Sequence, residues 1–148
     1  MEKVKVLFKK LDQRAKIPTY GSDFAAGADL YALCDGKIII PSGKSVFVHT
    51  GLSLEIPEGL AGLIYARSGL SCRRSLAPAN KVGVVDSDYR GEIMVCLHNH
   101  GEKDEEIENG ERIAQIVFTP YFAADFIESN ELSDTERGEK GFGSTGNK

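Results

Sequence analysis

The stretch Lys44-Ser45-Val46-Phe47-Val48-His49-Thr50-Gly51-Leu52-Ser53-Leu54-Glu55-Ile56 decides the fold, because its apolar residues recur at every second position. Successive side chains of a β-strand point to opposite faces, so the even-numbered residues of 46–56 would share one face. A helix would instead repeat its apolar residues every three to four positions. The pattern therefore predicts a long β-strand with one face in the core.

Shorter runs of the same character lie on both sides of this strand. β-branched and aromatic residues, which favour strands, are enriched in residues 3–11, 60–66, 81–85, 92–97, 112–118 and 121–127. Turn residues separate the runs, at Pro41-Ser42-Gly43, Pro57-Glu58-Gly59, Arg90-Gly91, Asn109-Gly110 and Pro120. Many short strands at this spacing predict an all-β fold, a jelly-roll-like antiparallel β-barrel.

Helix is the minority state in this prediction. Only residues 68–75 have a helical character, and the hydroxyl of Ser68 is suited to cap the start of that helix. Arg73 and Arg74 are predicted to lie on its solvated face. The acidic run 104–106 is predicted to be a solvated loop.

Composition excludes several classes of protein. With 148 residues, 41% of them hydrophobic, the chain suits one domain with its own core. The net charge of −4 argues against a general nucleic-acid surface, and no apolar run is long enough to span a bilayer. The N-terminus lacks the apolar block of a signal peptide. Three cysteines without a C-x-x-C pair suit a reducing compartment, so we expect a cytoplasmic protein, or a nuclear one in a eukaryote.

A change in composition divides the chain into a folded domain, residues 1–128, and a polar, glycine-rich C-terminal arm, residues 129–148. Residues 137–146 contain four glycines together with Arg137, Phe142, Ser144 and Thr145. Such a segment is costly to order, so it can simply be a frayed terminus. The same glycines would also let backbone N–H groups approach a phosphate, as in a clamp over a ligand.

Two internal segments carry candidate chemistry. Arg67-Ser68-Gly69 lies where a strand run gives way to the helical residues, and it is either an anion site or a capped turn. Residues 80–92 place two acids and a tyrosine between two strand runs, which predicts a hairpin with a polar tip. Asp86 in this tip is either a turn residue or a general base, and composition alone does not decide between them.

Five segments, taken in order, resemble the five signature motifs of the trimeric dUTPases. They are residues 26–32 (AGADLYA), 66–70 (ARSGL), 83–92 (GVVDSDYRGE), 110–116 (GERIAQI) and 137–146 (RGEKGFGSTG). The resemblance runs from about residue 20 to the end. One departure is Lys140, which stands where members of the family usually carry glycine.

The resemblance implies an enzyme that hydrolyses dUTP to dUMP and diphosphate by attack of an activated water on the α-phosphorus. Such an enzyme limits uracil in DNA and supplies dUMP for thymidylate synthesis. The family also implies a jelly-roll-like barrel, a magnesium ion (Mg2+) and a homotrimer whose active sites are shared between subunits. Nucleic acid and membrane are not expected as partners.

Individual roles follow from the same resemblance, beginning with the nucleoside. Asp86 would activate the attacking water, and Tyr89 would pack beneath the deoxyribose. The residues expected to read the uracil, mainly through their backbone, or to line its pocket are Asn80, Gly83, Val84, Val85, Asp86 and Met94.

Other residues would hold the triphosphate and the metal. The expected phosphate ligands, supplied by a different subunit from the uracil-reading segment, are Arg67, Ser68, Gly69 and Gln115. Asp29 would hold magnesium, largely through water. In the arm, the residues expected to contact the nucleotide are Arg137, Phe142, Gly143 and Ser144, with Phe142 stacked on the uracil and Arg137 near the phosphates.

Two alternatives remain at this point. A dCTP deaminase-like trimer shares the barrel, but it needs a glutamate placed for deamination, whereas the segment 85–89 fits water attack on phosphorus. A non-catalytic nucleotide-binding regulator would keep the barrel without the reaction, although every chemically active position is present here.

Overall fold

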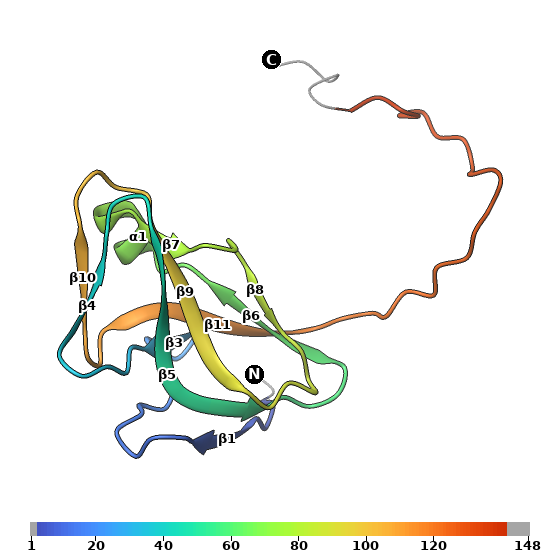
Figure 1. Cartoon of the computed structure of the whole chain (residues 1–148). Helices are drawn as coiled ribbons and strands as arrows, with labels where there is room; N and C mark the ends of the chain where they lie inside the picture. Colours follow the sequence, from blue (N-terminus) through green and yellow to red (C-terminus); the bar gives the residue numbers. More distant parts are fainter. Residues whose placement is uncertain (1–2, 142–148) are drawn as a thin grey trace.

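The computed structural model describes residues 3–141, and within them antiparallel strands and one short helix make up the fold (Figure 1). The strands are β1 (Leu7–Lys10), β2 (Thr19–Tyr20), β3 (Ala28–Tyr31), β4 (Lys37–Ile40), β5 (Ser45–Glu55), β6 (Leu60–Tyr65), β7 (Leu76–Pro78), β8 (Gly83–Val85), β9 (Glu92–Asn99), β10 (Glu105–Glu108) and β11 (Arg112–Pro120), and the helix is α1 (Ser68–Arg74). No helix in this part of the chain is long and apolar enough to cross a membrane.

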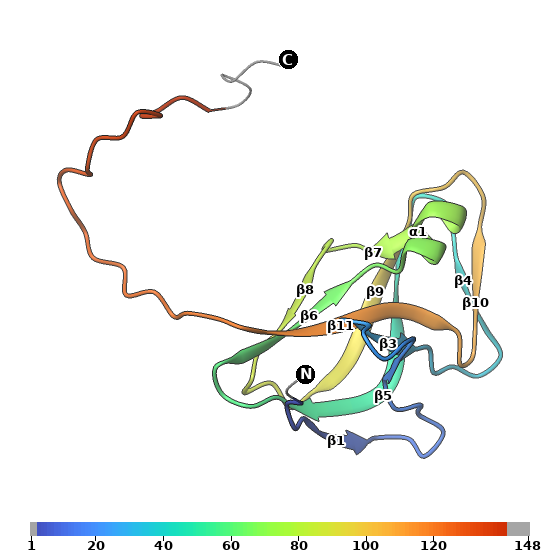
Figure 2. The same cartoon turned by 180° about the vertical axis from the view of Figure 1, so that it is seen from behind.

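The strands form two main sheets and one small one. The first has the order β1-β5-β9-β7, the second β2-β3-β11-β6-β8, and the small one pairs β10 with β4. Figure 2 shows β11 lying between β3 and β6 in the five-stranded sheet. The all-β, jelly-roll-like prediction is confirmed, with the strands in separate antiparallel sheets and not in one closed barrel.

The long strand β5 has the predicted alternation at its start and bends in its middle. Its register with β9 shifts between His49 and Ser53, and Gly51 lies there with a φ of 67°. A Cβ at Gly51 would come within 2.5 Å of Leu33, so only glycine fits the bend. This bend lets one strand pair with β9 at one end and with β1 at the other.

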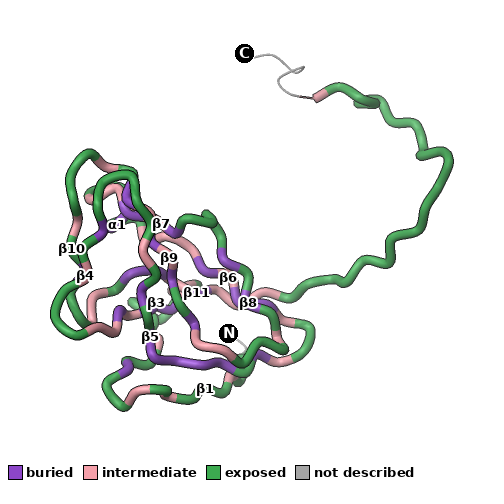
Figure 3. Tube along the Cα trace, in the orientation of Figure 1, coloured by how far each residue is buried: buried purple, intermediate pink, exposed green. Residues whose placement is uncertain are grey.

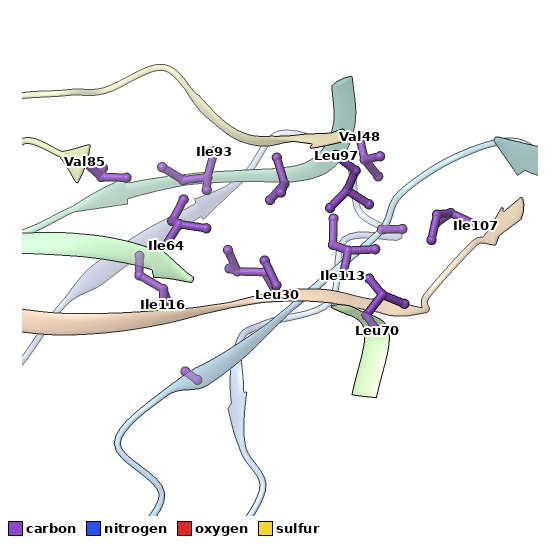
Figure 4. Packing of buried hydrophobic residues seen from close by; sticks show 14 of the residues in the cluster. Leu30, Val48, Ile64, Leu70, Val85, Ile93, Leu97, Ile107, Ile113 and Ile116 are labelled. Atoms are coloured by element: carbon purple, nitrogen blue, oxygen red, sulfur yellow. The ribbon is translucent and has the colours of Figure 1, made fainter. Parts of the chain in front are cut away.

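The core lies between the two main sheets. Leu97 and Val48 of the first sheet lie near Ile113 of the second, while Ile116 lies near Ile64, and Leu97, Val48, Ile113 and Ile116 are all fully buried (Figure 4). The helix contributes Leu70, its one buried residue. Burial of this apolar surface, at about 25 cal/mol per Å², is the main stabilising contribution to the fold.

The helix begins differently from the prediction. Its N-cap residue is Arg67, no side chain caps it, and Ser68 is already the first helical residue, so the predicted Ser68 cap is wrong. A capping hydroxyl must belong to the residue before the first helical turn, where the backbone is extended.

Arg74 is not the solvated residue that the sequence predicts. Its guanidinium donates to Glu105 at 2.6 Å, to Glu111 and to the carbonyl of Glu106. Burial opposes the charge, but the ion pairs with Glu105 and Glu111 outweigh burial and raise the pKa of Arg74 above its ordinary value. The acidic run is accordingly not a loop, because Glu105 and Glu106 belong to β10.

The predicted strand over residues 121–127 is wrong. In the structure this segment has no strand, and the chain is exposed from residue 120 to residue 140 (Figure 3). Phe122 is 100% exposed and Phe126 93% exposed. A strand needs a partner strand for its backbone hydrogen bonds, and in the described part of this chain the segment makes one such bond, from the Tyr121 N–H to the Gly59 carbonyl at 3.2 Å. The boundary between residues 128 and 129 stays a prediction.

One buried polar side chain joins the end of β4 to the loop between β9 and β10. Asn99 is fully buried, and its amide donates to the carbonyls of Ile40 at 2.9 Å and Lys103 at 2.7 Å. Its side-chain oxygen accepts from the Gly101 N–H at 2.9 Å. Every hydrogen-bonding group of the side chain is thus used.

We predict that Asn99→Ala lowers the free energy of unfolding by about 2–4 kcal/mol, because buried backbone groups lose their partners. Urea unfolding at fixed protein concentration measures the loss. The matched control is Asn130→Ala in the exposed arm, which should change stability by less than about 0.5 kcal/mol. Equal midpoints for the two variants would contradict the assigned role of Asn99.

Candidate active site

A buried carboxylate is the centre of the first half of the site. Asp29 lies on β3 between two core residues, so its side chain points away from the core. It is nevertheless only 7% exposed, because two arginines cover it. Arg67 Nε donates to Asp29 Oδ1 at 2.6 Å, and Arg112 Nη1 donates to Asp29 Oδ2 at 3.3 Å. A buried carboxylate is tolerated only when it is paired in this way.

Gln115 is placed beside this cluster by the sheet register. It lies directly opposite Asp29 of β3 on one side and Tyr65 of β6 on the other. Its amide nitrogen donates to the Ala66 carbonyl at 2.9 Å, immediately before Arg67. A Cβ at Gly27 would lie 2.5 Å from the Gln115 side-chain oxygen, so this glycine leaves the space that the amide occupies.

Three of the predicted phosphate and metal residues therefore lie together, and two more follow directly in sequence. The structure brings Asp29, Arg67 and Gln115 into one cluster, and Ser68 and Gly69 follow Arg67 as exposed residues at the start of α1. Two guanidinium groups around one carboxylate leave a local excess of positive charge in a chain whose net charge is −4. Such an excess suits a polyanionic ligand.

Arg112 is a residue that the sequence analysis missed. It begins β11, where the register shifts between Arg112 and Ala114. Ile113 and Ala114 are both fully buried, which breaks the alternation of the strand and brings Arg112 to the same face as Gln115. The apolar residues in consecutive positions, Ile113 and Ala114, were the signal that the strand contains a bulge.

The second half of the site is formed by the segment that connects the two main sheets. The predicted hairpin is wrong in its pairing, because β8 pairs with β6 whereas β9 pairs with β5 and β7. Local alternation predicts that strands exist but not which strand each one pairs with. Asp86 is the first residue after β8, and it is exposed.

Exposed apolar side chains also lie on β8, directly before this acid, and on β9. Val84 is 64% exposed and Met94 39% exposed. Tyr89 donates from its hydroxyl to the Glu92 carbonyl at 3.0 Å, which folds the ring over Gly91. Exposed apolar groups next to polar ones are typical of a ligand site.

The backbone of β8 is also available to a ligand. This strand is an edge of the five-stranded sheet, so it has a neighbouring strand on one side only. Gly83 and Val85 of this strand are buried. Asn80 is exposed in the turn before the strand. Backbone groups on the open side of an edge strand are unpaired and can bind another molecule.

The two halves lie at opposite ends of β6. Val85 pairs with Gly62, so Asp86 lies level with Ala61, whereas Arg67 comes six residues after Ala61. At ~3.3 Å per residue of a strand, Asp86 and Arg67 of one chain are about 20 Å apart. Asp29 is also three strands away from β8 across the sheet.

The described part of the arm, up to residue 141, joins neither half. Arg137 is exposed, and its Nε donates to the Lys140 carbonyl at 3.0 Å. Figure 1 shows the arm extending away from the sheets. Phe142, Gly143 and Ser144 lie outside the described residues.

Comparison with known proteins identifies the family. The family model for dUTPase matches residues 13–146. The chain belongs to the dUTPase family. It is 46% identical over 145 residues to a deoxyuridine 5'-triphosphate nucleotidohydrolase of Desulfitobacterium hafniense, covering 97% of this chain and 96% of that one. It is 48% identical to the protein of the same name from Nautilia profundicola, covering 97% and 99%.

A solved structure in the family has the same fold. The dUTPase of Staphylococcus bacteriophage 80alpha with dUpNHpp superposes with a TM-score of 0.88 at 28% identity, covering 96% of this chain and 98% of that one. The resemblance found in the sequence is thereby confirmed. These matches give the alternative of a dCTP deaminase-like enzyme no support.

We predict that Gly27→Ala displaces the Gln115 side chain from the Ala66 carbonyl and raises KM for dUTP, the substrate that names the family. A rise of about 3- to 10-fold corresponds to the loss of one hydrogen bond. Steady-state kinetics measures it, with thermal unfolding to confirm that the fold persists. Gly21→Ala is the matched control, since a Cβ there meets nothing within 4 Å. An unchanged KM in Gly27→Ala would show that the position of Gln115 is unimportant.

Proposed function

We propose that the chain hydrolyses dUTP to dUMP and diphosphate, with Asp86 as the general base for a water that attacks the α-phosphorus. The observation that supports this most is the match of residues 13–146 to the dUTPase family. Asp86 is exposed directly after the edge strand β8, which suits a base that must reach a water next to a bound nucleoside. The reaction removes dUTP from the DNA precursors and supplies dUMP for thymidylate synthesis.

Uracil is read by the open edge of β8 in this proposal. A strand backbone offers donors and acceptors at fixed positions, which can pair with the edge of uracil. The amino group of cytosine would leave the same groups mismatched. The remaining contacts come from Asn80, Gly83, Val84, Val85 and Met94, with Tyr89 beneath the deoxyribose.

The triphosphate is held by the cluster around Asp29. Arg67 and Gln115 have side-chain donors, and Ser68 and Gly69 offer a hydroxyl and backbone N–H groups at the end of β6. These groups stabilise the charge that moves onto the leaving diphosphate during the reaction.

The cluster around Asp29 offers magnesium few protein ligands. Within residues 3–141 no group of three or more metal-ligating side chains lies together, and both oxygens of Asp29 already accept hydrogen bonds from arginines. Mg2+ prefers phosphate oxygens and water as its ligands, so Asp29 would hold it through a water. Bound there, the ion would neutralise phosphate charge.

A homotrimer with shared sites accounts for the separation of the two halves. Because Asp86 and Arg67 of one chain are about 20 Å apart, we infer that one nucleotide contacts Asp86 of one subunit and Arg67 of another. The exposed apolar residues Phe122 and Phe126 suit contact with another subunit. The arm, with Arg137, Phe142, Gly143 and Ser144, would then close over a nucleotide bound between subunits.

We predict that Asp86→Asn lowers kcat by about 10²–10⁴-fold while binding of a non-hydrolysable dUTP analogue stays within a few-fold of wild type, since the general base acts on the reaction and less on affinity. Diphosphate release and calorimetry measure the two quantities. Asp88→Asn is the matched control in the same exposed loop, and it should turn over near the wild-type rate. A folded Asp86→Asn enzyme with wild-type kcat would refute the assignment.

We predict that two inactive variants regain activity when refolded together. A site that takes Asp86 from an Arg67→Ala chain and Arg67 from an Asp86→Asn chain is intact. Random mixing therefore restores up to about a quarter of the sites. Asp86→Asn mixed with Asn80→Ala is the control, because both changes damage the same half and no intact site can form. Absence of recovery in verified mixed oligomers argues against shared sites.

A further inference from the structure

A β-bulge aims the side chain of Arg112 at the buried carboxylate. In a regular strand, Arg112 and Gln115 would lie on opposite faces, because they are three residues apart. The register shift between Arg112 and Ala114 adds one residue to β11, so Ile113 and Ala114 both turn inward. Arg112 therefore reaches the same face as Asp29. Bulges commonly redirect a side chain near an active site.

The three charged side chains form a closed ring of hydrogen bonds. Arg67 Nε donates to Asp29 Oδ1 at 2.6 Å, and Arg112 Nη1 donates to Asp29 Oδ2 at 3.3 Å. Arg67 Nη1 also donates to the backbone carbonyl of Arg112 at 3.5 Å, which is a weak contact. The side chain of Arg112 is 51% exposed, and that of Asp29 is 10% exposed. Arg112 is thus the outer member of the ring.

The ring fixes the direction in which Arg67 presents its remaining donors. Its Nε and Nη1 are occupied, while Nη2 has no partner among the described residues. An arginine side chain is flexible, so holding it in one geometry before a ligand arrives reduces the entropy lost on binding. If Arg112 did not bind Oδ2 of Asp29, the carboxylate could rotate and accept hydrogen bonds from two nitrogens of Arg67 at once. This rotation would draw Nη2 of Arg67 toward the carboxylate.

We propose that Arg112 is a positioning residue for the phosphate end of the site. It holds Asp29 through Oδ2, so that Arg67 keeps one nitrogen on the carboxylate and presents Nη2 to a phosphate oxygen. This inference rests on the proposed role of Arg67 as a phosphate ligand. In this proposal, Arg112 does not itself contact the substrate.

The test is a double-mutant cycle between Arg112→Gln and Asp29→Asn, with KM and kcat measured for dUTP. Arg112→Gln is expected to raise KM by about 10-fold, the loss typical of one hydrogen bond to a charged group, and to change kcat less. Because Arg112 acts through Asp29, the double variant should be no worse than Asp29→Asn alone. Additive effects would mean that Arg112 contacts the nucleotide directly, and they would overturn the proposal.

Arg112→Lys separates positioning from folding. Lysine keeps one donor for Oδ2, so this variant should recover most of the loss in KM seen with Arg112→Gln, and it carries the test if Arg112→Gln does not fold. A KM as high as that of Arg112→Gln, or a wild-type KM in a folded Arg112→Gln enzyme, contradicts the role. Arg73→Gln, an exposed arginine on α1, is the control for removal of a charge and should leave KM within about twofold.

Arg67→Ala, measured in parallel, distinguishes this inference from the proposed function. If Arg67→Ala raises KM and Arg112→Gln does not, only the positioning role of Arg112 fails. If Arg67→Ala leaves KM unchanged, the proposed phosphate contact of Arg67 fails, and the role of Arg112 fails with it.

Discussion

The antiparallel pairing of β6 with β11 and β8 is the constraint on which the rest of the site depends. The register with β11 places Gln115 and Asp29 beside the end of β6, and the register with β8 places Asp86 beside its start. Strand spacing is fixed by backbone hydrogen bonds, which cannot be stretched to bring the two ends together. Asp86 and the cluster around Asp29 therefore lie at two separate places on each chain.

Placing a carboxylate at the end of this sheet has an energetic consequence. Asp29 is buried, and an unpaired buried charge costs several kcal/mol, so both of its oxygens need donors. The fold supplies them from two sides, with Arg67 following β6 and Arg112 turned inward by the bulge in β11. Compensation by two arginines leaves the cluster positively charged. Arg67, which helps to make the burial of Asp29 tolerable, is also the residue that we propose as a phosphate ligand.

Features that depend on local pattern could be predicted from the sequence, and features that depend on a distant partner could not. The alternation of residues 46–56, the glycine turns and the helix at residues 68–74 were visible because each is set by neighbours in sequence. The pairing of β8 with β6, the ion pairs of Arg74 and the aim of Arg112 depend on residues that lie far away in sequence. Residues 121–127 have the composition of a strand, but pairing requires a partner that the described chain does not supply.

Two exposed segments of the described chain, the edge strand β8 and the stretch after β11, both favour association with another chain. β8 is an open edge that carries the exposed Val84, and the segment after β11 displays Phe122 and Phe126 to solvent. Each is a liability in an isolated chain, since open edges and exposed aromatic side chains favour association. Both features would serve binding if the nucleotide lies between chains, because Asp86 of one chain then faces the cluster around Asp29 of a neighbour. In the proposed shared site each half contacts one end of dUTP, so affinity and catalysis would both depend on assembly.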